Sequence, residues 1–218
     1  MIPLKVKTIT EFISAGEKPE ILFWVGSAGS FDERAQKITR AFVTILNNAD
    51  IKFAVLGQEE TSSGDAAKRA GNEFLFQMQA LMNIELLNSY NITNIVTTCP
   101  HSYNTLKNEY KGLGGNYHVK HHTEFIEDLL DKGKLNFKSN LKGKKVTYHD
   151  PCYLGRANDV YEPPRNLIKK LGVDLIEMPR NKRKSFCCGA GGAQMFKEAE
   201  NGSAEINIVR TKEALATK

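Results

Sequence analysis

The chain has 218 residues, of which 41% are hydrophobic and 25% are charged, as is typical of a globular protein with its own core. Its formal net charge of +5 at pH 7 is too small to indicate a nucleic-acid partner. It has no apolar run long enough to span a membrane and no secretory leader. We therefore expect a cytoplasmic protein whose four cysteines are thiols or metal ligands.

Four buried strands are expected in the first 135 residues. Each apolar run is short and bounded by turn residues, as in a parallel sheet that is covered on both faces. The runs are EILFWVG (20–26), IKFAVLG (51–57), NIVTTC (94–99) and NYHVKHH (116–122).

Helical patterns alternate with these strands. One helix is expected between Ala35 and Leu46, another begins near Pro100, and a third has Thr123 as its N-cap and Gly133 as its stop. A long amphipathic helix is also expected. Its apolar face would comprise Phe74, Leu75, Met78, Leu81, Met82 and Leu86.

A polar stretch, 132–145, precedes a second series of elements. This series comprises a strand from 145, a helix at 163–172, a strand at 173–178, a cysteine-containing loop and a helix near 204–216. Strands that alternate with helices predict an α/β fold. We expect two pseudo-repeated lobes, residues 1–135 and 140–218, each a largely parallel sheet flanked by helices.

A shared spacing indicates that the two lobes are duplicates. Thirty-four residues separate Ser27 from the pair Ser62 and Ser63, and 34 residues separate Cys152 from the pair Cys187 and Cys188. A glycine follows each pair. The first lobe continues with Cys99 and Ser102, so serines occupy most of the positions at which the second lobe pattern has cysteines.

The three later cysteines predict a metal centre. Cys152 follows a strand, where parallel sheets place their ligands, and the vicinal pair begins a glycine-rich loop. Neighbouring thiolates fit one small ion poorly, whereas they suit an iron–sulfur cluster. The loop glycines would let backbone N–H groups approach the sulfurs. These are Gly189, Gly191 and Gly192.

Several motifs resemble a known family. HDPCYLGR, EPPR and SFCCGAGGAQMF are similar to the cysteine-rich CCG domain of the heterodisulfide reductase B subunit, the glycerol-3-phosphate dehydrogenase C subunit and lactate-utilisation iron–sulfur proteins. Segments of the first lobe, such as TTCPHSYNTLKNEY, resemble the same family. The resemblance implies an electron-transfer subunit of a cytoplasmic oxidoreductase complex that binds a 4Fe–4S cluster and a flavin-bearing or ferredoxin-like partner.

The sequence departs from the family pattern at several cysteine positions. In the first lobe only Cys99 remains, so we expect that site, with Ser27, Ser62, Ser63 and Ser102, to hold no cluster. In the second lobe Cys152, Cys187 and Cys188 persist, but the sequence stops at Lys218, before the family's Cys-x-x-Cys. A further ligand would come from elsewhere, or the chain is truncated, or the site is degenerate.

Two alternatives to an electron carrier remain open. The chain could be a scaffold or binding protein that kept the fold and lost its clusters. It could instead hold one zinc ion through Cys152, one or both of the paired cysteines, and His149. For His149 itself we favour a role in shaping the strand end, with a place beside the ligands as the second possibility.

Other polar residues are interpreted as structural. We expect His101 to be exposed, and His121 and His122 to point to opposite sides of a strand. The basic run 180–185 is expected to be a solvated loop, or else a docking patch for an acidic redox partner. Charges of helix starts and loops are expected at Asp32, Glu33, Glu59 and Glu60.

Overall fold

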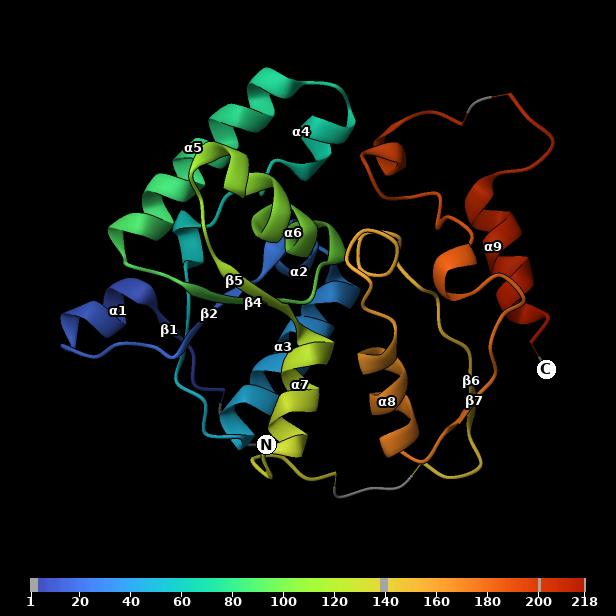
Figure 1. Ribbon diagram of the computed structural model, residues 1–218, viewed down its shortest axis with the longest axis horizontal. Helices are drawn as coiled ribbons and strands as arrows, with labels where there is room; N and C mark the ends of the chain where they lie inside the picture. Colours follow the sequence, from blue (N-terminus) through green and yellow to red (C-terminus); the bar gives the residue numbers. More distant parts are fainter. Residues whose placement is uncertain (1–3, 138–140, 200, 218) are drawn as a thin grey trace.

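The protein is built around a five-stranded parallel sheet. The computed structural model describes residues 4–137, 141–199 and 201–217. The strand order is β1–β3–β2–β4–β5, and every neighbouring pair is parallel (Figure 1). The strands are β1 (Lys7–Thr8), β2 (Ile21–Trp24), β3 (Phe53–Val55), β4 (Asn94–Thr97) and β5 (His118–His121). The expected α/β fold with parallel strands is confirmed.

The C-terminal region, residues 141–217, has a smaller sheet of its own. Strands β6 (Lys145–Val146) and β7 (Asp174–Leu175) pair in parallel. Helix α8 (Glu162–Lys170) connects them, and α9 (Ile206–Leu215) follows the cysteine loop. Figure 1 shows this region beside α6 and α7 of the N-terminal region, residues 4–137.

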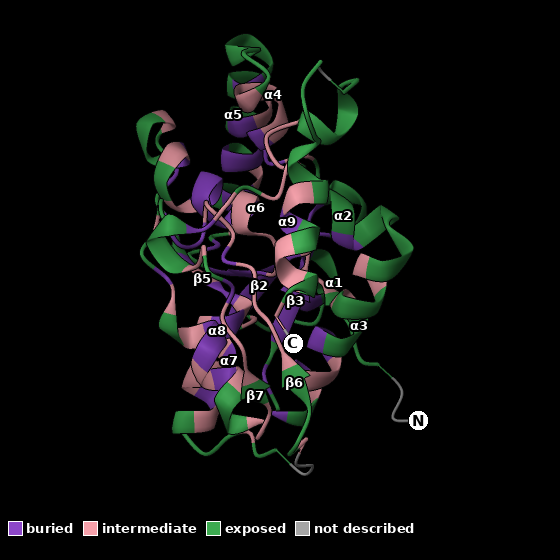
Figure 2. Ribbon diagram, turned by 90° about the vertical axis from the view of Figure 1, so that its right-hand side faces the viewer, coloured by how far each residue is buried: buried purple, intermediate pink, exposed green. Residues whose placement is uncertain are grey.

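Helices of the N-terminal region cover both faces of the large sheet. Helices α1, α5 and α6 pack on one face, with a core that includes Leu22, Trp24 and Ile95. Helices α3 and α7 pack on the other, around Phe23 and Val96. Figure 2 shows these buried residues along β2. The helices are α1 (Ile9–Ser14), α2 (Gly26–Phe31), α3 (Glu33–Asn48), α4 (Asp65–Arg69), α5 (Glu73–Ser89), α6 (Pro100–Asn104) and α7 (His122–Asp131).

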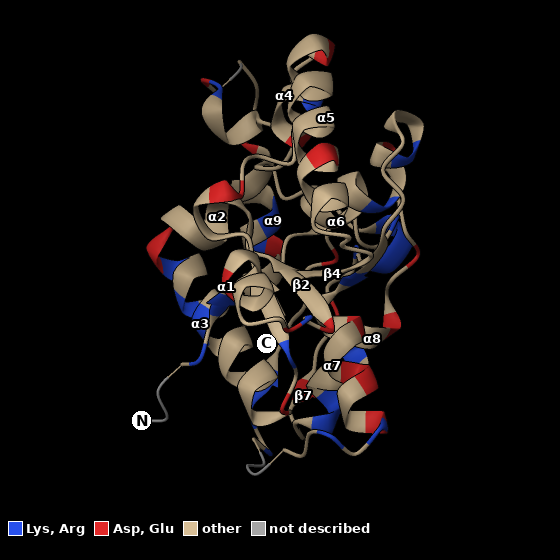
Figure 3. Cartoon of the chain, turned by 90° about the vertical axis from the view of Figure 1, so that its left-hand side faces the viewer, with Lys and Arg blue, Asp and Glu red and all other residues tan. Residues whose placement is uncertain are grey.

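Charge is kept off the central strands. Neither β2 (ILFW) nor β4 (NIVT) carries a charged side chain, whereas α3 and α7 carry several, as Figure 3 shows. This division is expected for strands that are covered on both faces. Asp32 acts as the N-cap of α3, where its Oδ1 accepts from the Ala35 N–H at 2.8 Å, so its predicted helix-start role is confirmed.

The outward face of α5 corrects a sequence expectation. The helix is present, but five of the apolar side chains expected to form its packing face are exposed, and Phe74 and Met82 are 76% and 60% accessible. The buried face consists of Phe76, Ala80, Asn83, Ile84 and Leu87. The sequence is apolar on both sides of this helix. Periodicity therefore identifies the helix without choosing the side that packs.

The start of α7 corrects two further expectations. His121 is the last residue of β5 and the N-cap of α7, so Thr123 lies inside the helix. The Glu124 carboxylate accepts from the His121 N–H at 2.9 Å. Because the strand ends between them, His121 and His122 do not alternate, and their ring centroids lie 4.2 Å apart. Burial lowers the pKa of His122 to about 4, so this ring is neutral at physiological pH.

Candidate metal centre

The two cysteine-bearing segments of the C-terminal region are tied to each other. The Ser185 hydroxyl donates to the Asp150 carbonyl at 3.0 Å, and the Lys182 N–H donates to Asp150 Oδ2 at 2.7 Å. Arg156 Nη1 donates to the Ser185 carbonyl at 2.8 Å. These bonds join the turn that carries Cys152 to the loop that carries Cys187, although about three dozen residues lie between them.

Backbone N–H groups face the sulfurs of the vicinal pair. The Gly189 N–H donates to Cys187 Sγ and the Ala190 N–H donates to Cys188 Sγ, both at 3.4 Å. Gly189 has a φ of +77°, which lets the chain turn back over the sulfurs. Such N–H groups stabilise negative charge on sulfur, as expected for ligands of a metal centre.

His149 adds a side-chain donor at Cys188. A hydrogen bond from His149 is the largest of the effects that lower the pKa of Cys188 to about 6, and the loop N–H groups assist it against burial. Arg210 of α9 donates through Nε to His149 Nδ1 at 2.9 Å. Because Nδ1 accepts, the imidazole proton resides on Nε2, the nitrogen that is free to donate to sulfur.

The Cys152 thiol lies in the same electrostatic environment. Burial is the first cause that raises its pKa, and the charges of Cys187 and Cys188 raise it further, while Arg156 opposes them. The mutual effect of the three thiols places them at one site. Cys152 and Cys188 are half-buried and Cys187 is exposed.

The site expected in the N-terminal region lies at a topological switch point. From β2 the chain proceeds to β3 on one side and later crosses to β4 on the other, so the carboxyl ends of β2 and β4 diverge there. Gly26 follows β2 with a φ of +78°, and a Cβ at this position would lie 3.8 Å from Ser102 Oγ and 3.9 Å from Cys99 Cβ. Cys99 is the N-cap of α6 and its Sγ accepts from the Ser102 N–H at 3.5 Å.

The remaining serines of this site have other partners. The Ser62 hydroxyl accepts from the Gly64 N–H at 3.2 Å, and the Ser63 carbonyl accepts from the Tyr110 hydroxyl at 3.0 Å. Ser63 is buried, and Ser27 is exposed on α2. The structure thus brings Gly26, Cys99 and Ser102 together, while the serine pair serves the loop before α4.

Comparison with known proteins gives the family. The model of the family CCG, described as "Cysteine-rich domain", matches residues 21–107 and 146–218, which together make up more than half of the chain. This chain belongs to the CCG family. We call the two matched ranges the first and second CCG segments, and the resemblance that the motifs indicate is confirmed at this level.

Three relatives show how this CCG chain compares with longer proteins. The probable iron-sulfur-binding oxidoreductase FadF of Bacillus subtilis (strain 168) is 47% identical over 213 residues, 97% of this chain and 30% of that protein. EtfAB:quinone oxidoreductase of Syntrophomonas wolfei is 46% identical over 185 residues, 85% and 26% of the two chains. The D subunit of dihydromethanophenazine:CoB–CoM heterodisulfide reductase from Methanosarcina acetivorans is 34% identical over 189 residues, 83% and 45%. The chain spans less than half the length of each.

In the first CCG segment a carboxylate occupies the strand-end N–H groups. Glu60 accepts from the Val25 N–H at 3.0 Å and from the Gly26 N–H at 2.5 Å. Burial raises the pKa of Glu60 to about 7, although these two N–H groups act to lower it. The expectation of an ordinary loop charge at Glu60 is therefore wrong. Its acceptor takes the backbone donors next to Cys99 and Ser102.

His101 and the basic run also differ from their sequence interpretation. His101 is 23% exposed rather than free, because its Nδ1 lies 2.7 Å from Asp65 Oδ2. Arg180 forms an ion pair with Glu213 at 2.9 Å and packs over the Phe186 ring. The run is thus partly built into the second CCG segment, while Arg183 and Lys184 are exposed.

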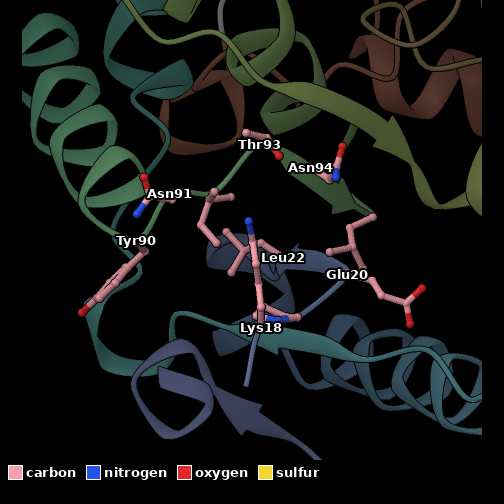
Figure 4. Close-up of a pocket in the computed structure, with 10 residues that line it drawn as sticks. Lys18, Glu20, Leu22, Tyr90, Asn91, Thr93 and Asn94 are labelled. Atoms are coloured by element: carbon pink, nitrogen blue, oxygen red, sulfur yellow. The ribbon is translucent and has the colours of Figure 1, made fainter. Parts of the chain in front are cut away.

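The described residues show neither a closed single-ion site nor a membrane-spanning helix. Within ranges 4–137, 141–199 and 201–217, no three His, Cys, Asp or Glu side chains are arranged to hold one metal ion. No helix in those ranges is both long and apolar enough to cross a bilayer. A pocket lined by Lys18, Glu20, Leu22 and Asn94 lies at the amino ends of β2 and β4, on the sheet edge opposite the cysteines (Figure 4).

Several residues that support the cysteine site were missed by sequence reasoning. Arg210, Ser185 and Arg165 contact it from positions that show no periodic or motif signal of their own. Only Arg165 lies in a quoted motif, EPPR, where its guanidinium binds Asp150. Contacts between residues far apart in the chain leave no trace in a single sequence.

Proposed function

We propose that this chain is the cysteine-rich, iron–sulfur-carrying part of an oxidoreductase complex, with one 4Fe–4S cluster held by Cys152, Cys187 and Cys188. The proposal is supported by the shared site of the three thiols and by relatives named as iron–sulfur proteins. Thiolates are the usual ligands of such clusters. The donor set fits a group of several metal atoms better than one ion.

When bound, the cluster would supply one-electron transfer. The protein's own contribution is to hold and polarise the sulfurs. Backbone N–H groups after the pair, and the His149 imidazole fixed by Arg210, would stabilise the charge of the ligands and so set the reduction potential. A non-protein group or a partner would complete the coordination of the cluster.

The partners and location that we propose follow the same logic. Relatives are named as a quinone oxidoreductase and as part of a heterodisulfide reductase, so we propose a flavin-bearing or ferredoxin-like protein as electron donor or acceptor. A cytoplasmic location is supported by the four cysteines, which are all free thiols. We place the lobe boundary between residues 135 and 140.

Metal content tests the function directly. The chain is purified without oxygen, and its iron, acid-labile sulfide, zinc and visible absorption are measured. Iron and sulfide with broad visible absorption support the proposal. Stoichiometric zinc without colour would replace it with a zinc protein, and the absence of both metals would leave a cluster-less scaffold.

A further inference from the structure

The glycine-rich loop of the second CCG segment rests on side chains of the first. A Cβ added to Gly191 would lie 2.4 Å from His101 Nε2 and 2.8 Å from its Cε1, so the imidazole occupies the space of a side chain at position 191. A Cβ at Gly192 would lie 3.3 Å from Arg69 Cβ. Figures 1 and 2 both show the segment after the cysteine pair beside α4, which ends at Arg69.

The other cysteine-bearing segment meets the same two side chains. Tyr153 directly follows Cys152, and its ring centroid lies 4.6 Å from that of His101. The Arg69 guanidinium carbon lies 4.7 Å from the Tyr153 ring centroid. His101 and Arg69 therefore contact both polypeptide segments that carry the thiols.

Both side chains are held from behind by a buried carboxylate. Asp65 Oδ2 lies 2.7 Å from His101 Nδ1, and Asp65 Oδ1 accepts from Arg69 Nε at 3.2 Å. The Asp65 side chain is 10% exposed. A carboxylate on Nδ1 fixes the orientation of an imidazole and directs Nε2 outward, here toward Gly191. Arg69 is also paired with Glu109.

We propose that Asp65, His101 and Arg69 form a clamp that sets the position of the cysteine centre. The clamp fixes the loop at Gly191 and the turn at Tyr153, and thereby the separation of Cys152 from the vicinal pair. The first CCG segment, which has lost most of its cysteines, keeps a role as one wall of the site in the second. This inference rests on the proposed function for the nature of the bound group, but the clamp itself acts on the thiols.

A double-mutant cycle tests the clamp. Gly191 is not in the left-handed region, so Gly191→Ala changes the available space without straining the backbone. The new methyl should displace the His101 ring and reduce iron content by about 10-fold. In His101→Ala the same methyl has room, so Gly191→Ala should cost little in that background. Gly112→Ala is the matched control, because a Cβ at Gly112 meets nothing within 4 Å.

Two readouts separate this role from general stability. The reduction potential of the cluster should shift in His101→Ala and in Asp65→Ala, while the thermal midpoint stays near that of Gly112→Ala. In cluster-free protein the alkylation rates of Cys152 and Cys188 should change in the same variants. Unchanged potential and alkylation in His101→Ala, or additive losses in the double variant, would overturn the clamp. Wild type that binds no iron sinks the proposed function alone, since alkylation still decides the clamp.

Discussion

Arg165 and Asp150 form a buried ion pair in which Nη1 and Nη2 donate to Oδ1 and Oδ2 at 2.7 and 2.8 Å. Both side chains are 2% exposed. Arg165 also donates to Glu177 on the other side. The pair links helix α8 to the turn that carries Cys152, so the EPPR and HDPC motifs are two halves of one structural contact.

We expect Arg165→Ala to lower the free energy of unfolding by about 3–5 kcal/mol, because the substitution leaves the Asp150 carboxylate buried without its partner. Urea unfolding followed by circular dichroism measures this change. Lys169→Ala on the exposed side of the same helix is the control and should change stability by less than about 0.5 kcal/mol. Equal effects of the two variants would show that the ion pair is not a main support of the turn.

Glu60 should make stability depend on pH. Its pKa is raised from 4.5 to about 7 by burial, so the folded protein holds this proton more tightly than the unfolded chain does. The contribution is present below the unfolded pKa and is lost as pH rises through about 7. Between about pH 5 and 8 the free energy of unfolding should fall by up to about 3 kcal/mol more in wild type than in Glu60→Gln.

The control for this pH dependence is Glu59→Gln, at the preceding position. Glu59 is exposed and accepts from the Tyr90 hydroxyl at 2.8 Å. Denaturant titrations at several pH values should give parallel profiles for this variant and wild type. A Glu60→Gln profile that also runs parallel to wild type would show that Glu60 is ionised in the folded protein at every pH tested.

The cysteines of the two segments should differ in their effect on iron binding. Cys187→Ser and Cys188→Ser each replace a thiolate by a harder, weakly acidic hydroxyl and should abolish the cluster. Cys99→Ser should retain nearly all of the iron and sulfide of wild type. Iron loss in Cys99→Ser as large as in the other two would assign the cluster to the first CCG segment.

The two faces of α5 should respond oppositely to substitution. Phe76 is 2% exposed in the core and Met82 is 60% exposed. Phe76→Ala should lower the free energy of unfolding by about 3–5 kcal/mol, whereas Met82→Gln should change it by no more than about 0.5 kcal/mol. Urea titration of both variants is the measurement. A large loss in Met82→Gln would mean that this side chain packs inside the protein.

The strands of the large sheet are predictable because each is a short apolar run between turn residues. All four runs expected in the first 135 residues contain a strand of the structure. The two-residue strand β1 was missed, because a run so short carries no periodic signal. The packing side of α5 was wrong for a different reason: both of its sides are apolar, and only the tertiary structure selects Phe76 over Met82.

The candidate site was predictable in its cysteines and not in their surroundings. A repeated spacing draws attention to Cys152, Cys187 and Cys188 without any knowledge of the fold. Arg210 lies 61 residues from the His149 that it orients. Asp65 lies 36 residues from His101. Such pairs are created by the folded chain, and neither partner stands in a repeating pattern.

The position of Glu60 sets a condition for engineering this protein. Cysteines installed at positions 27, 62, 63 and 102 would recreate the ligand pattern of the second CCG segment in the first. The Glu60 carboxylate would still hold the N–H groups of Val25 and Gly26, and would repel incoming thiolates. A two-cluster variant would therefore also need a neutral residue at position 60, so that the strand-end donors become available to sulfur.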